Sequence, residues 1–425
     1  MQHQIRSIAI LVPLDDYGVC TYCHELAMGL AVNGVEVDIY AAFGSRPKAD
    51  GRSYGFFPVL GSALFRQRKS LQEGIRDHDS CASAGSSISS SIPKESANSK
   101  SRLRSAIREQ FLSLELALHL KRKRYDVIWT QWPDMDGYGI SFWKFSKLLR
   151  MKVVHLVHNV LPHESSPRDK AFCDRLYRVC DLLFVHSKYS RKELLNHFPG
   201  LDQKTLITQH GLYTIYPRRP EARERVRREL NIPSGTVALL FCGGVRPYKN
   251  IDPVIASLRD ERCLGAILIV AGVESGYTDS SSEDRLARTR RIATEFGVLE
   301  RVRLIPRFLD TFEMAELFEA GDVLTLPYLE NYGSGQLLLG MTFGKYIIAT
   351  VFGGLDEYLV GYPNHTLLQG TETDSVLEGI CEAVESVNRR PAESGPARPD
   401  LEWSTIARRS LEAMNRFYSH GISSE

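Results

Sequence analysis

Short runs of β-branched and other apolar residues alternate with longer helical patterns along most of the chain, and this alternation limits the fold more than any other feature. Such alternation is typical of parallel sheets whose strands are joined by crossover helices. The ten runs that we predict to be strands are 8–13, 35–41, 126–130, 153–158, 182–186, 236–242, 266–271, 302–306, 323–327 and 346–350. Several of them are apolar throughout, which indicates sheets covered by helices on both faces. We therefore predict an α/β fold.

The length of the chain and two breaks in this pattern predict how it is divided. A chain of 425 residues, 43% of them apolar, exceeds one ordinary core and suits two domains of about 200 residues each. Three prolines and a charged helical stretch mark a seam at 205–235. We predict an N-terminal domain at 1–210, a C-terminal domain at 211–400 and a helix at 401–425. A Ser- and Ala-rich segment at 78–101 lacks periodicity, and we predict a mobile loop there.

After that segment, residues 102–124 are predicted to form an amphipathic helix that ends in four consecutive basic residues. The apolar residues that we place on one face are Leu103, Ile107, Phe111, Leu114 and Leu118. One interpretation is a surface helix that packs by this face, with cations favoured at its C-terminal end. The alternative is a patch that contacts anionic lipid headgroups.

Composition argues against several classes of function. A net charge of +2 with 24% charged residues gives no sign of a nucleic-acid partner. The N-terminus lacks a signal-peptide layout, and no apolar run approaches the roughly 20 residues that span a bilayer. Cys20 and Cys23 have C-x-x-C spacing, but without a second Cys/His pair we expect no metal or redox role. We expect a reduced, cytoplasmic protein that can contact a membrane only at its inner surface.

A glycine turn follows the first predicted strand. Tyr17 and Gly18 precede a helix that starts near Thr21, so the first N–H groups of that helix could bind an anion. The turn lacks the pattern G-x-G-x-x-G, which argues against a nicotinamide-dependent oxidoreductase. The alternative is an ordinary tight turn.

A histidine-rich stretch follows the predicted strand at 153–158. Ligands of open α/β sheets bind beyond the carboxyl ends of the strands, so we predict that His158 contacts a sugar hydroxyl or a leaving-group oxygen. His155 lies on the opposite face of the strand and is expected to pack. His163 is a weaker candidate, and a proline before it argues against a metal site with Glu164.

The stretch VALLFCGGVRPYKN is the most informative in the chain. A buried strand ends in two glycines that let backbone approach a ligand closely, and Arg246 and Lys249 follow before a helix. Arginine offers a planar fork to phosphate oxygens, while lysine adds a mobile point charge. We predict that Gly244, Arg246 and Lys249 form a clamp for a diphosphate.

A second glycine-rich turn supports the clamp. Ser334 and Gly335 precede an apolar helix that starts near Gln336, and its first N–H groups could bind the same phosphates. Glu330 lies just before this turn, within reach of a sugar at the clamp.

Taken in order, these segments resemble the large retaining GT-B glycosyltransferase family, family 4 of the glycosyltransferase classification (glycosyl transferases group 1). The segments that carry the resemblance are YGVCTYCHELAMGLAVNGVEVDIY, VCDLLFVHSKYSRKEL, FCGGVRPYKN and GSGQLLLGMTFGKYIIAT. The resemblance implies two Rossmann-like domains with parallel sheets that face each other across a cleft. The acceptor would bind mainly to the first domain and the donor nucleotide to the second, with retention and no metal. The last helix would cross back to the first domain.

The resemblance also implies roles for individual residues. Gly18 matches the glycine loop beside the donor phosphates, His158 the histidine near the reacting sugar, and the basic pair the diphosphate site. Members usually carry a pair of glutamates in the penultimate loop and its helix. Here Asn331 stands at the first position and Leu339 at the second, so ribose recognition must differ, and either Glu330 or Asn331 would contact the sugar.

We therefore expect a transferase that moves a hexosyl unit from a nucleotide sugar to a saccharide or lipid-linked saccharide, as in exopolysaccharide assembly, without a cofactor. Tyr17 and His163 are the acceptor-side candidates. Two alternatives stay open: a sugar-nucleotide epimerase of the same fold, and a non-catalytic binding partner that the missing glutamate would fit.

Overall fold

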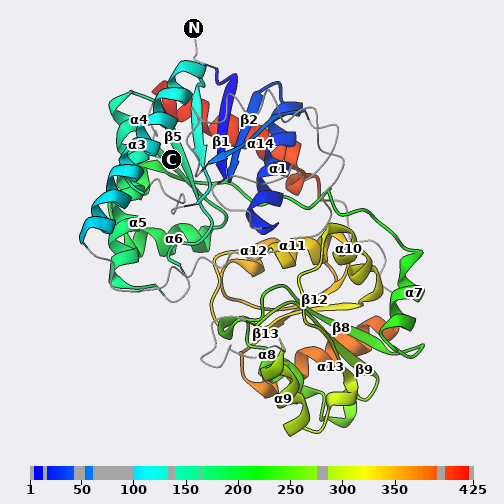
Figure 1. Ribbon diagram of the computed structural model, residues 1–425. Coiled ribbons are helices and arrows are strands. Elements are labelled where there is room, and N and C mark those ends of the chain that lie inside the picture. The colour runs from blue at the N-terminus through cyan, green and yellow to red at the C-terminus, as the bar shows by residue number, and fades with distance from the viewer. Residues whose placement is uncertain are drawn as a thin grey trace, which may run out of the picture.

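The computed structural model describes residues 4–12, 17–42, 53–60, 99–132, 139–162, 165–274, 286–389 and 398–420. Within these ranges the chain forms two parallel sheets, which Figure 1 shows as an upper and a lower lobe. The predicted mobile loop falls on residues outside the described ranges, except that residues 99–101 belong to a helix. No helix of the described residues is both long and apolar enough to cross a membrane.

The N-terminal half builds a sheet of seven strands in the order β3-β2-β1-β4-β5-β6-β7. Its strands are β1 (Ser7–Val12), β2 (Glu36–Ala42), β3 (Gly55–Leu60), β4 (Val127–Thr130), β5 (Val153–Val157), β6 (Leu182–Val185) and β7 (Thr205–Ile207). Its helices are α1 (Tyr17–Val32), α3 (Ser99–Lys123), α4 (Ser141–Leu148), α5 (Pro167–Val179) and α6 (Lys188–His197).

The C-terminal half builds a sheet of six strands in the order β10-β9-β8-β11-β12-β13. Its strands are β8 (Val237–Cys242), β9 (Ala266–Ala271), β10 (Val302–Ile305), β11 (Val323–Leu326), β12 (Tyr346–Thr350) and β13 (His365–Leu368). The helices are α7 (Ala222–Glu229), α8 (Ile251–Ser257), α9 (Ala287–Glu295), α10 (Thr311–Ala320), α11 (Gly335–Thr342), α12 (Leu355–Leu359), α13 (Thr373–Arg389) and α14 (Trp403–His420).

The strand orders place a topological switch point in each sheet. In the second sheet the chain turns to one side after β8 and returns to the other side at β11, so these two strands are neighbours. The same reversal puts β1 beside β4 in the first sheet. Crevices at such points, beyond the carboxyl ends of the strands, are the usual ligand sites of open α/β sheets. The predicted α/β class is confirmed, and all ten predicted strands exist, with ends that differ by at most one residue.

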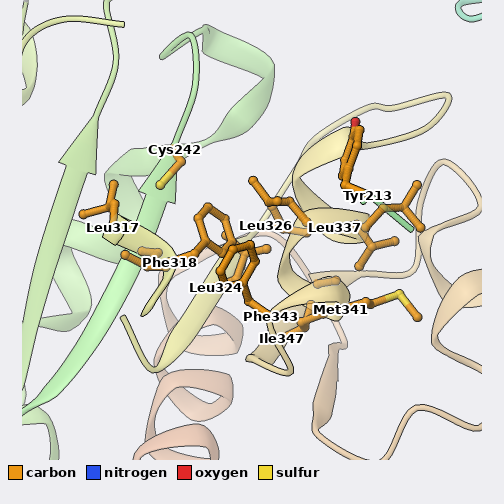
Figure 2. Packing of buried hydrophobic residues seen from close by; sticks show 14 of the residues in the cluster. Tyr213, Cys242, Leu317, Phe318, Leu324, Leu326, Leu337, Met341, Phe343 and Ile347 are labelled. Carbon is orange, nitrogen blue, oxygen red and sulfur yellow. The ribbon is translucent and has the colours of Figure 1, made fainter. Parts of the chain in front are cut away.

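Each sheet is buried on both faces because its strands carry apolar residues at successive positions. In β1, Ala9 and Leu11 belong to one core cluster, while Ile8 and Ile10 belong to another. In the second sheet, side chains of α10, β11 and α11 pack in one cluster, and Figure 2 shows them around Leu324. This packing holds the N-terminal end of α11, next to the glycine-rich turn, in place.

The last helix, α14, packs against α1 although the two lie at opposite ends of the sequence, as Figure 1 shows. Trp403 is buried in the same core cluster as Tyr22 and Leu26 of α1. A β-carbon on Gly29 would lie 2.4 Å from the Trp403 carbonyl oxygen, so α1 needs glycine at this contact. The terminal helix thus completes one core face of the first sheet.

For three of its five residues, the predicted apolar face of α3 does not pack against the sheet; Leu118 is half-buried, and the side chain of Leu103 lies outside what the structure describes. The α3 side chains that pack in the core are Leu112, Leu116, Ala117 and Leu120. Ile107, Phe111 and Leu114 are 61%, 57% and 40% exposed. Residues 111–120 carry apolar side chains around most of the helix, so helical periodicity alone could not show which of them would face the sheet.

Candidate functional site

A cavity of about 160 Å³ lies between the two halves. Its lining residues are Gly18, Val19, Tyr22, His158, Asn159, His186, His210, Tyr213, Gly333, Ser334, Gly335, Leu338 and Tyr358. His158 and His186 directly follow β5 and β6 of the first sheet, whereas the glycine-rich turn follows β11 of the second. The carboxyl ends of both sheets therefore meet at this cavity.

Hydrogen bonds between the two halves hold the cavity walls in place. The buried carboxylate of Glu25 accepts from Thr214 Oγ1 at 2.7 Å and from the Ile215 N–H at 3.0 Å. On the other side, Glu357 accepts from the backbone N–H groups of Lys188 and Tyr189, at 2.9 and 2.8 Å. These two N–H groups lie in the first turn of α6, where a carboxylate is electrostatically favoured.

Four of the predicted site residues line this cavity together: Gly18, His158, Ser334 and Gly335. Gly18 lies in the first turn of α1, because this helix begins at Tyr17, four residues earlier than the predicted start near Thr21. Both acceptor-side candidates, His163 and the side chain of Tyr17, lie outside what the structure describes.

Three histidines and Tyr22 form one aromatic cluster in the cavity wall. The ring of Tyr22 lies 5.0 Å from that of His158, 5.3 Å from that of His186 and 4.9 Å from that of His210, between centroids. Burial lowers the pKa of His186 to about 4 and that of His210 to about 3. Burial also lowers the pKa of His158 well below its usual range. The cluster is therefore neutral at pH 7.

His155, by contrast, faces away from the cavity. Its ring packs near that of Tyr177, in the core on the other face of the sheet, and its Nδ1 lies 2.7 Å from Thr130 Oγ1. The alternation of side chains along β5 separates the two histidines, as the sequence predicts.

Lys249 lies next to the glycines that end β8. Its side chain is 8% exposed, and its Nζ donates to the Cys242 carbonyl oxygen at 3.2 Å. A β-carbon on Gly243 would lie 3.1 Å from Lys249 Nζ and 3.5 Å from Gln336 Nε2. Gly243 has φ +86°, which glycine adopts readily. The glycine thus leaves a space at which the lysine and the first turn of α11 converge.

The positive charges of Lys249 and Arg246 have no partner of opposite sign among the described residues. Burial lowers the pKa of Lys249 to about 8, and the neighbouring Arg246 guanidinium adds to that shift. Arg246 itself is exposed and forms no ion pair within the described ranges. Two adjacent cations, one of them buried, form a site that an anion would stabilise.

The first turn of α11 faces the same space. The Ser334 hydroxyl accepts from the Leu337 N–H at 3.3 Å and caps the helix. The N–H groups of Gly335 and Gln336 lie in the first turn of the helix and therefore have no intrahelical acceptor. A β-carbon on Gly335 would lie 2.6 Å from Tyr213 Oη, so the hydroxyl is packed directly against this helix start. The buried Oε1 of Gln336 has no partner among the described residues.

Residues 222–394 match the model of the family Glycosyl transferases group 1. The match includes every strand of the second sheet, residues 244–249 and the glycine-rich turn. A D-inositol 3-phosphate glycosyltransferase of Corynebacterium glutamicum is 26% identical over 251 residues, which make up 54% of this chain and 57% of that protein. The chain therefore spans little more than half the length of this curated relative.

Two solved structures resemble the whole chain. Starch synthase IV of Arabidopsis thaliana, its catalytic domain bound to ADP and acarbose, superposes with a TM-score of 0.67 at 12% identity over 97% of this chain and 99% of that one. HepE of Anabaena in complex with UDP and glucose superposes with a TM-score of 0.62 at 16% identity, with the same two coverages. The fold is that of the GT-B glycosyltransferases.

Glu330, Asn331 and Leu339 are the residues at or beside the positions where the family resemblance implies a glutamate pair. Glu330 is exposed and lies near Tyr248, whose pKa is raised by burial and further by the Glu330 carboxylate. Asn331 is 4% exposed; its Oδ1 accepts from the Gly333 N–H at 3.2 Å, and its buried Nδ2 has no partner among the described residues. Leu339 packs in the core cluster under α11.

The cavity also contains residues for which the sequence analysis proposed no role: Tyr22, His186, His210, Tyr213 and Tyr358. His186 is the last residue of a predicted strand, as His158 is, so the same rule could have identified it. The other four come from helices and from the segment between the halves, where no local pattern marks a ligand site.

Proposed function

We propose that this chain is a retaining, metal-independent hexosyltransferase that takes its hexosyl unit from a nucleotide sugar. One observation carries the proposal. Lys249 converges with the first turn of α11 at the switch point between β8 and β11, and neither it nor the neighbouring Arg246 has a partner of opposite charge among the described residues. A nucleoside diphosphate supplies the charge that this arrangement lacks. Arg246 and Lys249 would also take the role that a metal ion has in other transferases, because a metal ion and these cations alike neutralise the departing diphosphate.

In the proposed reaction, the bond between the anomeric carbon and the diphosphate oxygen breaks first. Arg246, Lys249 and the N–H groups at Ser334 and Gly335 stabilise the negative charge that grows on the leaving group. An acceptor hydroxyl then attacks from the face that the diphosphate leaves, which retains the configuration, and its proton passes to the departing diphosphate oxygen. His158 borders the sugar in the cavity, and Glu330 or Asn331 contacts it from the loop before α11.

The acceptor that we propose is a saccharide or a lipid-linked saccharide in polysaccharide assembly. It would enter along the first sheet, from the side of Gly18 and Tyr17, while the nucleotide occupies the second. Retention, the absence of a metal requirement and this acceptor class are inferences from the family resemblance and from the site.

The purified protein is expected to release a nucleoside diphosphate from at least one nucleotide sugar, and to do so faster when a saccharide acceptor is present. A panel of UDP-, ADP- and GDP-hexoses, followed by diphosphate detection and product chromatography, measures this. Conversion of the donor to an isomer without acceptor would instead identify an epimerase. Tight donor binding with no turnover on any acceptor would identify a binding partner.

A membrane surface as the place of reaction is supported by α3. The exposed side chains of Ile107, Phe111 and Leu114 share this helix with an exposed basic run at its C-terminal end, residues 121–124. Apolar side chains that enter the headgroup region beside several cations are typical of helices that lie on anionic membranes. We therefore propose contact with the inner face of a membrane.

The full chain is expected to sediment with vesicles of phosphatidylglycerol and phosphatidylcholine at low salt, and much less with phosphatidylcholine alone. The double change Ile107→Ser and Phe111→Ser should weaken this binding several-fold, because it removes the apolar part of the contact. Leu264→Ser is the matched control, since Leu264 is 71% exposed on the other half of the chain. Equal sedimentation of all three proteins would contradict a role for α3.

A further inference from the structure

A chain of hydrogen bonds behind the cavity starts at a backbone carbonyl. Nδ1 of His186 lies 3.0 Å from the carbonyl oxygen of Thr208, the residue after β7. A carbonyl oxygen can only accept, so Nδ1 of His186 must carry the proton. Burial keeps this imidazole neutral, and its Nε2 is therefore a bare acceptor.

The second link fixes the tautomer of His158. Nε2 of His186 lies 3.2 Å from Nδ1 of His158. Because Nε2 of His186 can only accept, Nδ1 of His158 must donate. A neutral His158 is then left with a lone pair on Nε2.

The third link is the side-chain amide of Gln131, the fully buried residue after β4. Its Oε1 is placed 3.1 Å from Nε2 of His158, while its Nε2 is buried without a partner among the described residues. Turning the amide by half a rotation pairs a donor with an acceptor at this link, because its N–H then donates to the Nε2 lone pair of His158. An imidazolium that donates to both neighbours would also fit the distances, but burial beside His186 and His210 lowers the pKa of His158 too far for that.

We propose that His186 is a positioning residue that holds His158 in the Nδ1–H tautomer and aims its Nε2 lone pair at the carboxyl end of β4. All three links then run in one direction, from Gln131 through His158 and His186 to the carbonyl of Thr208. His158 consequently accepts from Gln131, or from a hydroxyl that replaces it, and does not donate a proton at Nε2. The effect on turnover rests on the proposed function, whereas the tautomer does not.

The tautomer is measured on the full chain, with ¹⁵N-labelled histidine, by long-range ¹H–¹⁵N correlation at pH 7. Loss of one set of signals in His158→Asn assigns the residue. The wild type is expected to show the Nδ1–H form of His158, and His186→Phe to shift it toward the Nε2–H form. His186→Gln should restore the Nδ1–H form, because its side-chain oxygen can accept where Nε2 of His186 did.

His210→Phe is the matched control. It removes a partly buried histidine of the same aromatic cluster that forms no hydrogen bond with His158, so the tautomer of His158 should not change. Where the protein transfers sugar, His186→Phe should lower kcat about tenfold and leave the affinity for the nucleoside diphosphate unchanged, with partial rescue in His186→Gln. An imidazolium or an Nε2–H form of His158 in the wild type would overturn the inference, as would an unchanged tautomer in His186→Phe. A folded protein that shows the expected tautomers but transfers no sugar would contradict the proposed function alone.

Discussion

Replacing Arg246 by alanine is expected to lower kcat/KM for the nucleotide sugar on the order of 100- to 1000-fold, the loss typical when one donor to a developing anion is removed. Arg246 is exposed at the carboxyl end of β8 and forms no ion pair within the described ranges, so the substitution removes charge without breaking the fold. The unfolding temperature should therefore stay within about a degree of the wild type, as for most surface substitutions.

Steady-state transfer assays and calorimetric titration with a nucleoside diphosphate measure the two parts of this effect. Arg291→Ala is the matched control, because Arg291 is an exposed arginine of the same half that pairs with Glu295 on α9. Arg246→Lys should recover part of the affinity, since an ammonium keeps the charge but loses the planar fork. Normal transfer by Arg246→Ala would show that the diphosphate binds elsewhere.

The fold was predictable where strands are long and apolar. The runs that form β1, β8 and β9 are apolar at successive positions. Such runs are typical of strands that are buried on both faces of a sheet. β3 was missed because Gly55 and Pro58 lie inside it, and both residues usually argue against a strand. β7 was missed because it has only three residues, too few to show a period, and β13 was missed because it begins with the polar residues His365 and Thr366.

The site was predictable where chemistry follows directly on a strand. His158, Lys249 and Gly335 each lie at or near the carboxyl end of a predicted strand, and general rules for α/β sheets point there. Tyr22 and Tyr213 reach the cavity only because α1 and the segment after β7 are brought together by the packing of the two halves. That packing depends on contacts distant in sequence, such as Glu25 with Thr214, which no local pattern encodes.

Replacing Lys249 by methionine is expected to stabilise the protein while abolishing its affinity for the nucleoside diphosphate. Burial lowers the pKa of Lys249 from 10.5 to about 8, so the charged form is disfavoured in the native state at pH 7. Each pKa unit corresponds to about 1.4 kcal/mol. The substitution also removes the hydrogen bond that Lys249 donates to the Cys242 carbonyl, which costs about 1 kcal/mol. The expected net gain in the free energy of unfolding is about 2 kcal/mol, or roughly 4–8 °C in Tm.

The control for this variant is Lys345→Met. Lys345 is equally buried, its pKa is also lowered by burial to about 8, and it lies at the amino ends of β11 and β12, away from the cavity. It should show a comparable change in Tm without any loss of diphosphate affinity. If Lys249→Met bound the diphosphate as tightly as the wild type, the buried ammonium would have no part in the site.

The stability of the wild-type protein and its affinity for the diphosphate should also respond to pH in opposite directions. Between about pH 8 and 10.5 the unfolded chain keeps the Lys249 proton while the native protein loses it, so this residue makes the native state more stable as pH rises. The stability gap between Lys249→Met and the wild type should therefore close over this range. Diphosphate affinity of the wild type should fall over the same range, because the neutral amine no longer attracts phosphate. Thermal unfolding and titration calorimetry at pH 7 and pH 9.5 measure both, and the opposite signs separate a ligand-binding lysine from a structural one.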